Sequence, residues 1–240
     1  MLCRAGAMSA VMTYVLHFAP DNASLIVRLA LDHADLPYEA RLVDRSTRAQ
    51  ETAAYRALNP NGLIPALETP HGVLFETGAI VLWLADTHGG LGPAPDDAQR
   101  GNWLKWLIFV ANTLHPALRM TFYPEKYAGT DRRDQARLRR QLQAQITDQL
   151  RRLDDAAADW QASAPTVLDF YIAGCLRWCA LYPEDTDRGW FDLSAYPALH
   201  ATCSRVETLP ACATLERAEG LGDTPFTAPR APTPPYGSAT

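Results

Sequence analysis

The feature that most constrains the fold of this 240-residue chain is a run rich in glycine and proline at residues 89–97, Gly-Gly-Leu-Gly-Pro-Ala-Pro-Asp-Asp. Such a run is typical of a linker between domains. The residues before it alternate between strand-like and helix-like segments, whereas the residues after it have helical periodicity as far as residue 219. We therefore predict two domains, residues 13–88 and residues 98–219, joined by a linker at 89–97.

The first domain has the pattern of a small α/β unit. Apolar alternation predicts strands, apolar residues three or four apart predict helices, and proline and glycine mark the turns. The Asn-Pro-Asn-Gly sequence at 59–62, for example, ends a helix and turns the chain. The expected order is strand 14–18, helix 24–35, strand 38–43, helix 47–58, strands 66–69 and 73–75, and helix 76–88.

The second domain is expected to contain helices only. From Leu138 to Trp160 apolar residues recur at every third or fourth position, which predicts one long amphipathic helix starting after Asp131. Thr166 and Asp169 have the capping-box spacing and predict the start of a core helix.

Both ends of the chain fall outside these two domains. We interpret residues 1–12 as an untargeted N-terminal extension, because they combine one basic residue with only a weakly apolar segment. Residues 220–240 are rich in proline and are expected to be extended or disordered.

Composition and charge exclude several classes of function. The chain has 22 Lys+Arg against 27 Asp+Glu, a net charge of −5, which argues against nucleic acid or an anionic membrane as the main partner. No apolar run reaches the length of a membrane span. No glycine-rich nucleotide motif follows the first strand, and the histidines have no zinc-binding spacing, so neither a nucleotide enzyme nor a metal site is expected.

The cysteines favour a reducing environment. Their number, 5, is odd, which disfavours a secreted disulfide framework and makes the cytoplasm the expected location. Cys175 and Cys179 are four residues apart on a predicted helix and could in principle bind a metal. Both lie in its apolar stripe, however, so we interpret them as core residues.

Four motifs, in this order, resemble the glutathione S-transferase superfamily over roughly residues 13–219, and in particular its bacterial members. They are Pro20-Asp-Asn-Ala-Ser-Leu25, similar to the Pro-Gly-x-Cys-Ser-Leu loop of the beta class; residues 59–67, similar to the segment that leads into a cis-proline and the third strand; residues 76–80, similar to a Glu-Ser-x-Ala-Ile helix start; and the capping box at 166–169. The resemblance implies a thioredoxin-like α/β domain followed by an all-α domain.

The resemblance also implies glutathione as cosubstrate, with a side chain or amide that stabilises its thiolate. Ala23 stands where the beta class has its catalytic cysteine, so a mixed disulfide at that residue is excluded. The position near the end of the first strand, where other classes have a tyrosine, lacks one here. Ser24 is the first candidate donor to the sulfur and Asn22 the second. The alternative role of Ser24 is to cap the first helix, and Asn22 could be an ordinary loop residue.

By the same resemblance, five residues bind glutathione: Arg48, Ile64, Pro65, Glu76 and Thr77. The backbone of Ile64, before a cis-proline, would pair with the cysteinyl part of the tripeptide. Glu76 and Thr77, at a helix start, would hold the γ-glutamyl ammonium and carboxylate. Arg48 would bind the glycyl carboxylate, and its alternative is a solvated surface arginine.

The second substrate is expected to contact the first helices after the linker. Candidates for this pocket are Phe109, Asn112, Thr113 and Phe122. The implied protein is a cytoplasmic, homodimeric glutathione transferase that adds glutathione to small apolar electrophiles. The alternatives are a glutathione-dependent peroxidase, lyase or isomerase, and a ligand-binding protein without catalysis.

Overall fold

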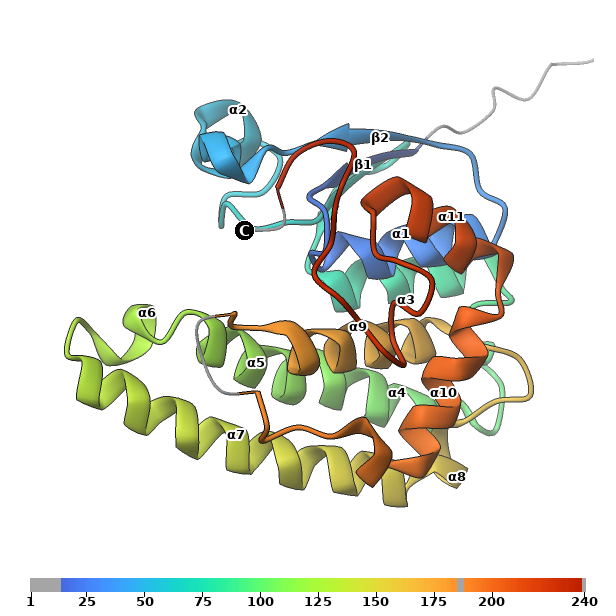
Figure 1. Cartoon of the computed structure of the whole chain (residues 1–240). Helices are drawn as coiled ribbons and strands as arrows, with labels where there is room; N and C mark the ends of the chain where they lie inside the picture. The colour runs from blue at the N-terminus through green and yellow to red at the C-terminus, as the bar shows by residue number, and fades with distance from the viewer. Residues whose placement is uncertain (1–13, 185–187, 239–240) are drawn as a thin grey trace, which may run out of the picture.

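The computed structural model describes residues 14–184 and 188–238, so the expected N-terminal extension lies outside the described residues. Figure 1 shows a small sheet with its helices packed on one side of a bundle of longer helices. The predicted α/β domain and helical domain are therefore both confirmed. No helix of the described residues is long and apolar enough to cross a membrane.

The N-terminal sheet has the strand order β2-β1-β3-β4. Strand β1 pairs in parallel with β2 and antiparallel with β3, which in turn pairs antiparallel with β4. Helix α1 makes the crossover that a parallel pair requires. The elements are β1 (Tyr14–Phe18), α1 (Ser24–His33), β2 (Tyr38–Leu42), β3 (Ala66–Thr69), β4 (Gly72–Phe75) and α3 (Thr77–His88). All six were predicted, with boundaries shifted by two residues at most.

The helix predicted over 47–58 is wrong for most of its length. The segment forms two 3₁₀ turns, η1 (Arg45–Thr47) and η2 (Ala49–Glu51), and then the short helix α2 (Ala53–Arg56). Arg48, between the two turns, has a left-handed backbone with φ 57° and interrupts the helical path. Thr52 then starts α2 as its N-cap, because its side chain accepts a hydrogen bond from the amide of Tyr55.

The helical domain begins with one nearly continuous rod in which a π-helical turn separates α4 from α5. The predicted long helix is broken at Ala156, which separates α7 from α8. The elements are α4 (Arg100–Phe109), η3 (Val110–Leu114), α5 (His115–Phe122), α6 (Glu125–Ala128), α7 (Arg132–Asp155), α8 (Ala157–Trp160), α9 (Val167–Leu181), η4 (Leu193–Ala195), α10 (Pro197–Glu207) and α11 (Pro210–Glu219).

The capping box at the start of α9 is confirmed. The amide of Thr166 donates to the Asp169 carboxylate at 2.8 Å, and the Thr166 hydroxyl accepts from the amide of Leu168. The indole of Trp103 donates to the same hydroxyl at 3.1 Å, which ties α4 to the start of α9. Cys175 and Cys179, further along α9, are fully buried core residues, as predicted.

Helix α1 joins the two domains into one core. It packs against α3 on its own domain and against α9 and α11 of the helical part. Gly174 of α9 permits the close approach, since a Cβ there would lie 3.2 Å from a side-chain carbon of Ile26. The expected linker is also docked: Leu91 is buried and its carbonyl accepts from the amide of Val167 at 2.9 Å.

A buried ion pair connects the loop after β1 to α9. Arg177 donates from Nε and Nη2 to the two carboxylate oxygens of Asp21, each at 2.8 Å, and both side chains are fully buried. Trp178 and Tyr182 donate to the same carboxylate at 3.1 and 2.7 Å. Four hydrogen bonds therefore satisfy Asp21 and fix the conformation of its loop.

The proline-rich tail is extended, one of the two predicted states, and residues 220–238 are ordered. In Figure 1 it runs back over the N-terminal domain. Arg177 again supplies the anchor, because it donates to the carbonyls of Pro225 and Arg230 at 2.9 and 3.0 Å. The Glu207 carboxylate accepts from the amides of Phe226 and Thr227, and Phe226 is 1% exposed.

Removing the acid of the buried pair should destabilise the protein strongly. We expect Asp21→Ala to lower the free energy of unfolding by about 3–5 kcal/mol, because Arg177 would stay buried with an unpaired charge. Urea denaturation followed by circular dichroism measures this change. The matched control is Asp148→Ala, which breaks an exposed pair with Arg151 and should cost at most about 1 kcal/mol. Equal losses in the two variants would contradict a stabilising role for the buried pair.

Candidate functional site

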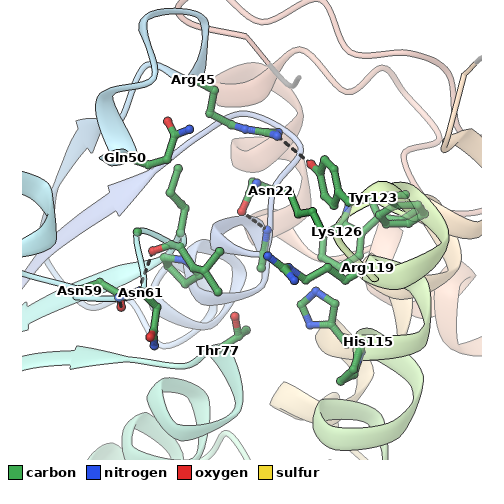
Figure 2. Close-up of a pocket in the computed structure, with 18 of the residues that line it drawn as sticks. Asn22, Arg45, Gln50, Asn59, Asn61, Thr77, His115, Arg119, Tyr123 and Lys126 are labelled. Carbon is green, nitrogen blue, oxygen red and sulfur yellow. Dashed lines mark hydrogen bonds between the residues drawn. The ribbon is translucent and has the colours of Figure 1, made fainter. Parts of the chain in front are cut away.

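A cavity of about 750 Å³ lies where the N-terminal domain meets α5, α6 and the end of α9. Three walls enclose it. The first is the loop between β1 and α1, the second is the segment before β3 together with the start of α3, and the third is the helical wall of α5 and α6. Figure 2 shows polar side chains from all three directed into the same space.

The first wall is the loop at Asp21, Asn22 and Ala23, all of which line the cavity. Asp21 has a left-handed backbone with φ 49°, a conformation that aspartate tolerates better than most residues. Its carboxylate is held by Arg177. The side-chain oxygen of Asn22 accepts from the amide of Ala23 at 2.8 Å. The NH₂ group of Asn22 is therefore the part of that side chain that can donate to a ligand in the cavity.

The prediction that Ser24 faces the ligand is wrong. Ser24 is fully buried and does not line the cavity. Its hydroxyl donates to the carbonyl of Ala19 at 3.0 Å and accepts from the amide of the same residue at 3.3 Å. It closes the turn that precedes α1 and makes no capping bond to the helix. Of the two predicted donors, Asn22 is the one at the cavity.

The second wall agrees with the prediction. The Ile64-Pro65 peptide bond is cis, as the motif implied, and both residues line the cavity. The side chains of Tyr55 and Asn59 donate to the carbonyl of Leu63 at 2.8 and 2.7 Å, which holds the segment that leads into Ile64.

Glu76 and Thr77 lie beside this segment, at the start of α3, and line the same cavity. Glu76 has φ 70°, a left-handed backbone that a non-glycine residue adopts only when its surroundings impose it. This sharp turn brings Glu76 and the helix N-terminus to the cavity together. The four predicted binding residues Ile64, Pro65, Glu76 and Thr77 therefore form one continuous surface.

The fifth predicted binding residue, Arg48, is not part of the cavity lining. Its side chain is 74% exposed and pairs with Glu51. Arg48 has a left-handed backbone, and the arginines of this segment that line the cavity are Arg45, three residues earlier, and Arg56. Arg45 donates to the hydroxyl of Tyr123 on the opposite wall at 2.7 Å, and Gln50 lies beside it in the lining.

The third wall corrects most of the predicted second-substrate pocket. Phe122 lines the cavity as predicted, whereas Phe109, Asn112 and Thr113 do not. The lining residues of this stretch include Ala111, His115, Arg119 and Phe122, which share one face at helical spacing, together with Pro116 and Tyr123. The three wrong candidates precede or follow Ala111 by one or two residues and so point away from that face. The spacing of these residues could have identified the stripe from the sequence. Which face of the helix lies toward the cavity depends on how the N-terminal domain packs against it, and the spacing does not give that.

His115 and Tyr171 form a neutral polar pair in this wall. Nδ1 of His115 lies 2.9 Å from the hydroxyl of Tyr171, and its ring packs at 5.2 Å from the ring of Trp178. Burial, with the nearby charge of Arg119, lowers the pKa of His115 to about 4. Burial raises the pKa of Tyr171 above its ordinary value. Both groups are therefore uncharged at neutral pH.

No group of three histidine, cysteine, aspartate or glutamate side chains capable of holding a metal is found in residues 14–184 and 188–238.

The sequence and the structure were compared with known proteins. A family model for the N-terminal domain of glutathione S-transferases matches residues 23–87. The structure of a sphingomonad glutathione S-transferase in complex with glutathione superposes with a TM-score of 0.71, at 30% identity, over 87% of this chain and 100% of that chain. The chain belongs to the glutathione S-transferase superfamily. Its first domain is the thioredoxin-like domain of these transferases and its second is their helical domain.

Two further relatives of this transferase-family chain are bacterial. A glutathione S-transferase of Xanthomonas campestris is 28% identical over 214 residues, which cover 86% of this chain and 98% of the relative. A maleylacetoacetate isomerase of Rhizobium meliloti is 32% identical over 190 residues, which cover 75% of this chain and 84% of the relative.

Restoring a cysteine at the beta-class position should create a reactive thiol. Ala23 lines the cavity at the N-terminus of α1, where the helix dipole lowers a thiol pKa. We expect Ala23→Cys, treated with glutathione disulfide, to gain one glutathione as the new thiolate attacks the disulfide and releases the other glutathione. Mass spectrometry of the peptide that contains residue 23 measures the adduct.

The control for this experiment is Ser24→Cys, whose sulfur would replace a buried hydroxyl one residue further along the chain. This variant should remain unmodified. Equal modification of both variants, or of neither, would contradict the placement of residue 23 at the cavity and of residue 24 in the core.

Proposed function

We propose that this protein is a glutathione transferase that binds glutathione along the first and second walls and activates its thiol for attack on a second substrate. The observation that carries the proposal is the convergence of Asn22, the backbone before the cis-proline, and the Glu76-Thr77 helix start on one cavity. These groups match, one for one, the parts of an extended tripeptide with a thiol at its centre.

The tripeptide is accommodated by complementary charge and hydrogen bonding. The backbone of Ile64 pairs with the cysteinyl residue as an added strand would. The N-terminus of α3 at Thr77 attracts the γ-glutamyl carboxylate, and the Glu76 carboxylate binds its ammonium group. The glycyl carboxylate extends toward Arg45 and Gln50, which take the role that the sequence suggested for Arg48.

Activation of the thiol needs a modest free energy. A thiol of ordinary pKa is only a few per cent ionised at neutral pH, and lowering its pKa by two units requires about 2.7 kcal/mol of preferential thiolate binding. A hydrogen bond from the Asn22 amide to a charged sulfur is worth roughly 1.5–3 kcal/mol. The N-terminus of α1 adds about 0.3–1 kcal/mol. Together they cover the requirement without a tyrosine, serine or cysteine.

A glutathione-dependent isomerase is the second candidate. The observation that favours it is the similarity to the maleylacetoacetate isomerase of Rhizobium meliloti, of which this chain covers 84%. An isomerase would use the same thiolate, which adds to a double bond, permits rotation about the resulting single bond, and leaves again. The first and second walls serve both reactions equally, so the second substrate distinguishes them.

We also propose that the protein acts as a homodimer in a reducing cytoplasm, with a role in the removal of electrophiles. The homodimer is what the resemblance to the family implies. The four cysteines within the described residues are all unpaired and buried, which supports a reducing location.

The central test of this proposal substitutes the two candidate donors separately. We expect Asn22→Ala to lower kcat/KM with chlorodinitrobenzene by about 10-fold or more, because the thiolate loses a charge-assisted hydrogen bond. Ser24→Ala should change it by about twofold at most, because the Ser24 hydroxyl bonds only to Ala19. Steady-state kinetics at saturating glutathione gives both values.

Retention of each variant on immobilised glutathione separates binding from activation. Both should be retained, since the second wall is unchanged. A wild-type protein that is not retained and shows no turnover would overturn the proposed function. Full activity of Asn22→Ala with intact glutathione binding would overturn the role of Asn22 alone.

A further inference from the structure

The helical wall of the cavity is basic and aromatic rather than simply apolar. Arg119 of α5 donates to the hydroxyl of Tyr127 and lies about 6 Å from the rings of both Tyr123 and Tyr127. Nζ of Lys126 lies 4.4 Å from the centre of the Tyr123 ring. All four residues line the cavity. Two cations and two flat phenol rings thus occupy the third wall of the cavity, which faces the first and second walls.

These two cations differ from two arginines outside the cavity lining, which are held in ion pairs. Arg177 is paired with Asp21, and Arg48 with Glu51. Within residues 14–184 and 188–238, neither Arg119 nor Lys126 forms an ion pair. The contacts described above join both side chains to tyrosines.

Within the described residues, no carboxylate that lines the cavity forms an ion pair with Arg119 or Lys126. Asp21 is bound by Arg177, Glu51 by Arg48, and Glu76 lies at the start of α3 on the second wall. Glu184, beyond the end of α9, is the remaining acid of the lining. The helical wall therefore keeps a local positive charge in a chain whose net charge is −5. In such a chain an anionic ligand is attracted by local groups and not by a general basic field.

Arg119 lies where a second substrate would lie, not where glutathione ends. It follows His115 by one turn of α5, and burial together with the charge of Arg119 lowers the pKa of that ring. Figure 2 shows Arg119 and His115 together on the helical wall, with Thr77 on the opposite side of the space, while Arg45 and Gln50 lie at another edge. With the glycyl carboxylate assigned to Arg45 and Gln50 under the proposed function, Arg119 is left to bind a second anionic group.

We propose that the second substrate carries a carboxylate on an aromatic or unsaturated carbon skeleton, with Arg119 as the carboxylate anchor. Lys126 adds positive charge, and the rings of Tyr123 and Tyr127 contact the flat skeleton. This inference rests on the proposed function and replaces the small apolar electrophile expected from the sequence with an anionic one.

A suitable probe is a chloronitrobenzoate with chlorine para to the carboxylate and nitro ortho to the chlorine. The glutathione thiol first loses its proton to solvent. The thiolate attacks the carbon that carries chlorine, a sulfur–carbon bond forms, the carbon–chlorine bond breaks, and chloride leaves with the bonding electrons. The methyl ester of the same compound undergoes the same reaction without the carboxylate charge.

The experiment compares kcat/KM for the acid and for its ester, each divided by the rate constant of the uncatalysed reaction. We expect the wild type to favour the acid, and Arg119→Gln to reduce the preference by about 10-fold, because a charge-assisted bidentate contact is lost. Turnover of the ester and the KM for glutathione should stay within about twofold. Arg119→Lys should keep part of the preference, and Arg140→Gln, on the exposed face of α7, should keep all of it.

Three other outcomes are informative. An active wild type that does not prefer the acid, or a preference that Arg119→Gln leaves unchanged, contradicts the inference and leaves the proposed function intact. A raised KM for glutathione with an unchanged preference assigns Arg119 to glutathione and also contradicts the inference. No turnover of either compound, combined with failure to bind glutathione, contradicts the proposed function and this inference with it.

Discussion

The buried ion pair between Asp21 and Arg177 is the interaction on which the site depends. Arg177 donates to the Asp21 carboxylate and also to two carbonyls of the C-terminal tail, so one side chain of α9 holds the loop after β1 and the last residues of the chain together. Burying two charges costs free energy. The pair is stable because four hydrogen bonds satisfy the Asp21 carboxylate. The result is a loop whose next residue, Asn22, is fixed at the edge of the cavity.

The same constraint explains why the loop can work without the usual catalytic side chain. Asp21 stands where the beta-class motif has glycine and adopts a left-handed backbone, a conformation that glycine reaches without strain. The side chain of Asp21 fixes this conformation by bonding to Arg177. Glu76 is a second left-handed residue, and it brings the N-terminus of α3 to the cavity. Glutathione would therefore meet two helix N-termini and an amide, all held by rigid elements. The thiolate would be stabilised by the positions of these groups and not by one reactive side chain.

Much of this architecture was predictable from the sequence, because it depends on local patterns. The strands, α1, α3, the capping box at Thr166 and the segment at Ile64-Pro65 all follow from periodicity, turn residues or family motifs. The role of Ser24 was wrongly predicted because sequence spacing does not set the direction of a side chain in a tight turn. The role of Arg48 was wrongly predicted because its left-handed backbone interrupts the expected helix, and Arg45 lines the cavity instead. The helical wall was misassigned by one or two residues, which is enough to change the face of a helix. The ordered tail depends on Arg177, more than 40 residues away, and no local pattern reports such a contact.

The central claim is that the loop held by Arg177 presents donors to the sulfur of bound glutathione and stabilises its thiolate. The most direct measurement is the pKa of the bound thiol, obtained from the ultraviolet absorbance of the thiolate as pH is varied with the protein saturated by glutathione. We expect a pKa lower than that of free glutathione by about two units, and a smaller shift in Asn22→Ala. A bound thiol that titrates at the pH of the free tripeptide would contradict the claim.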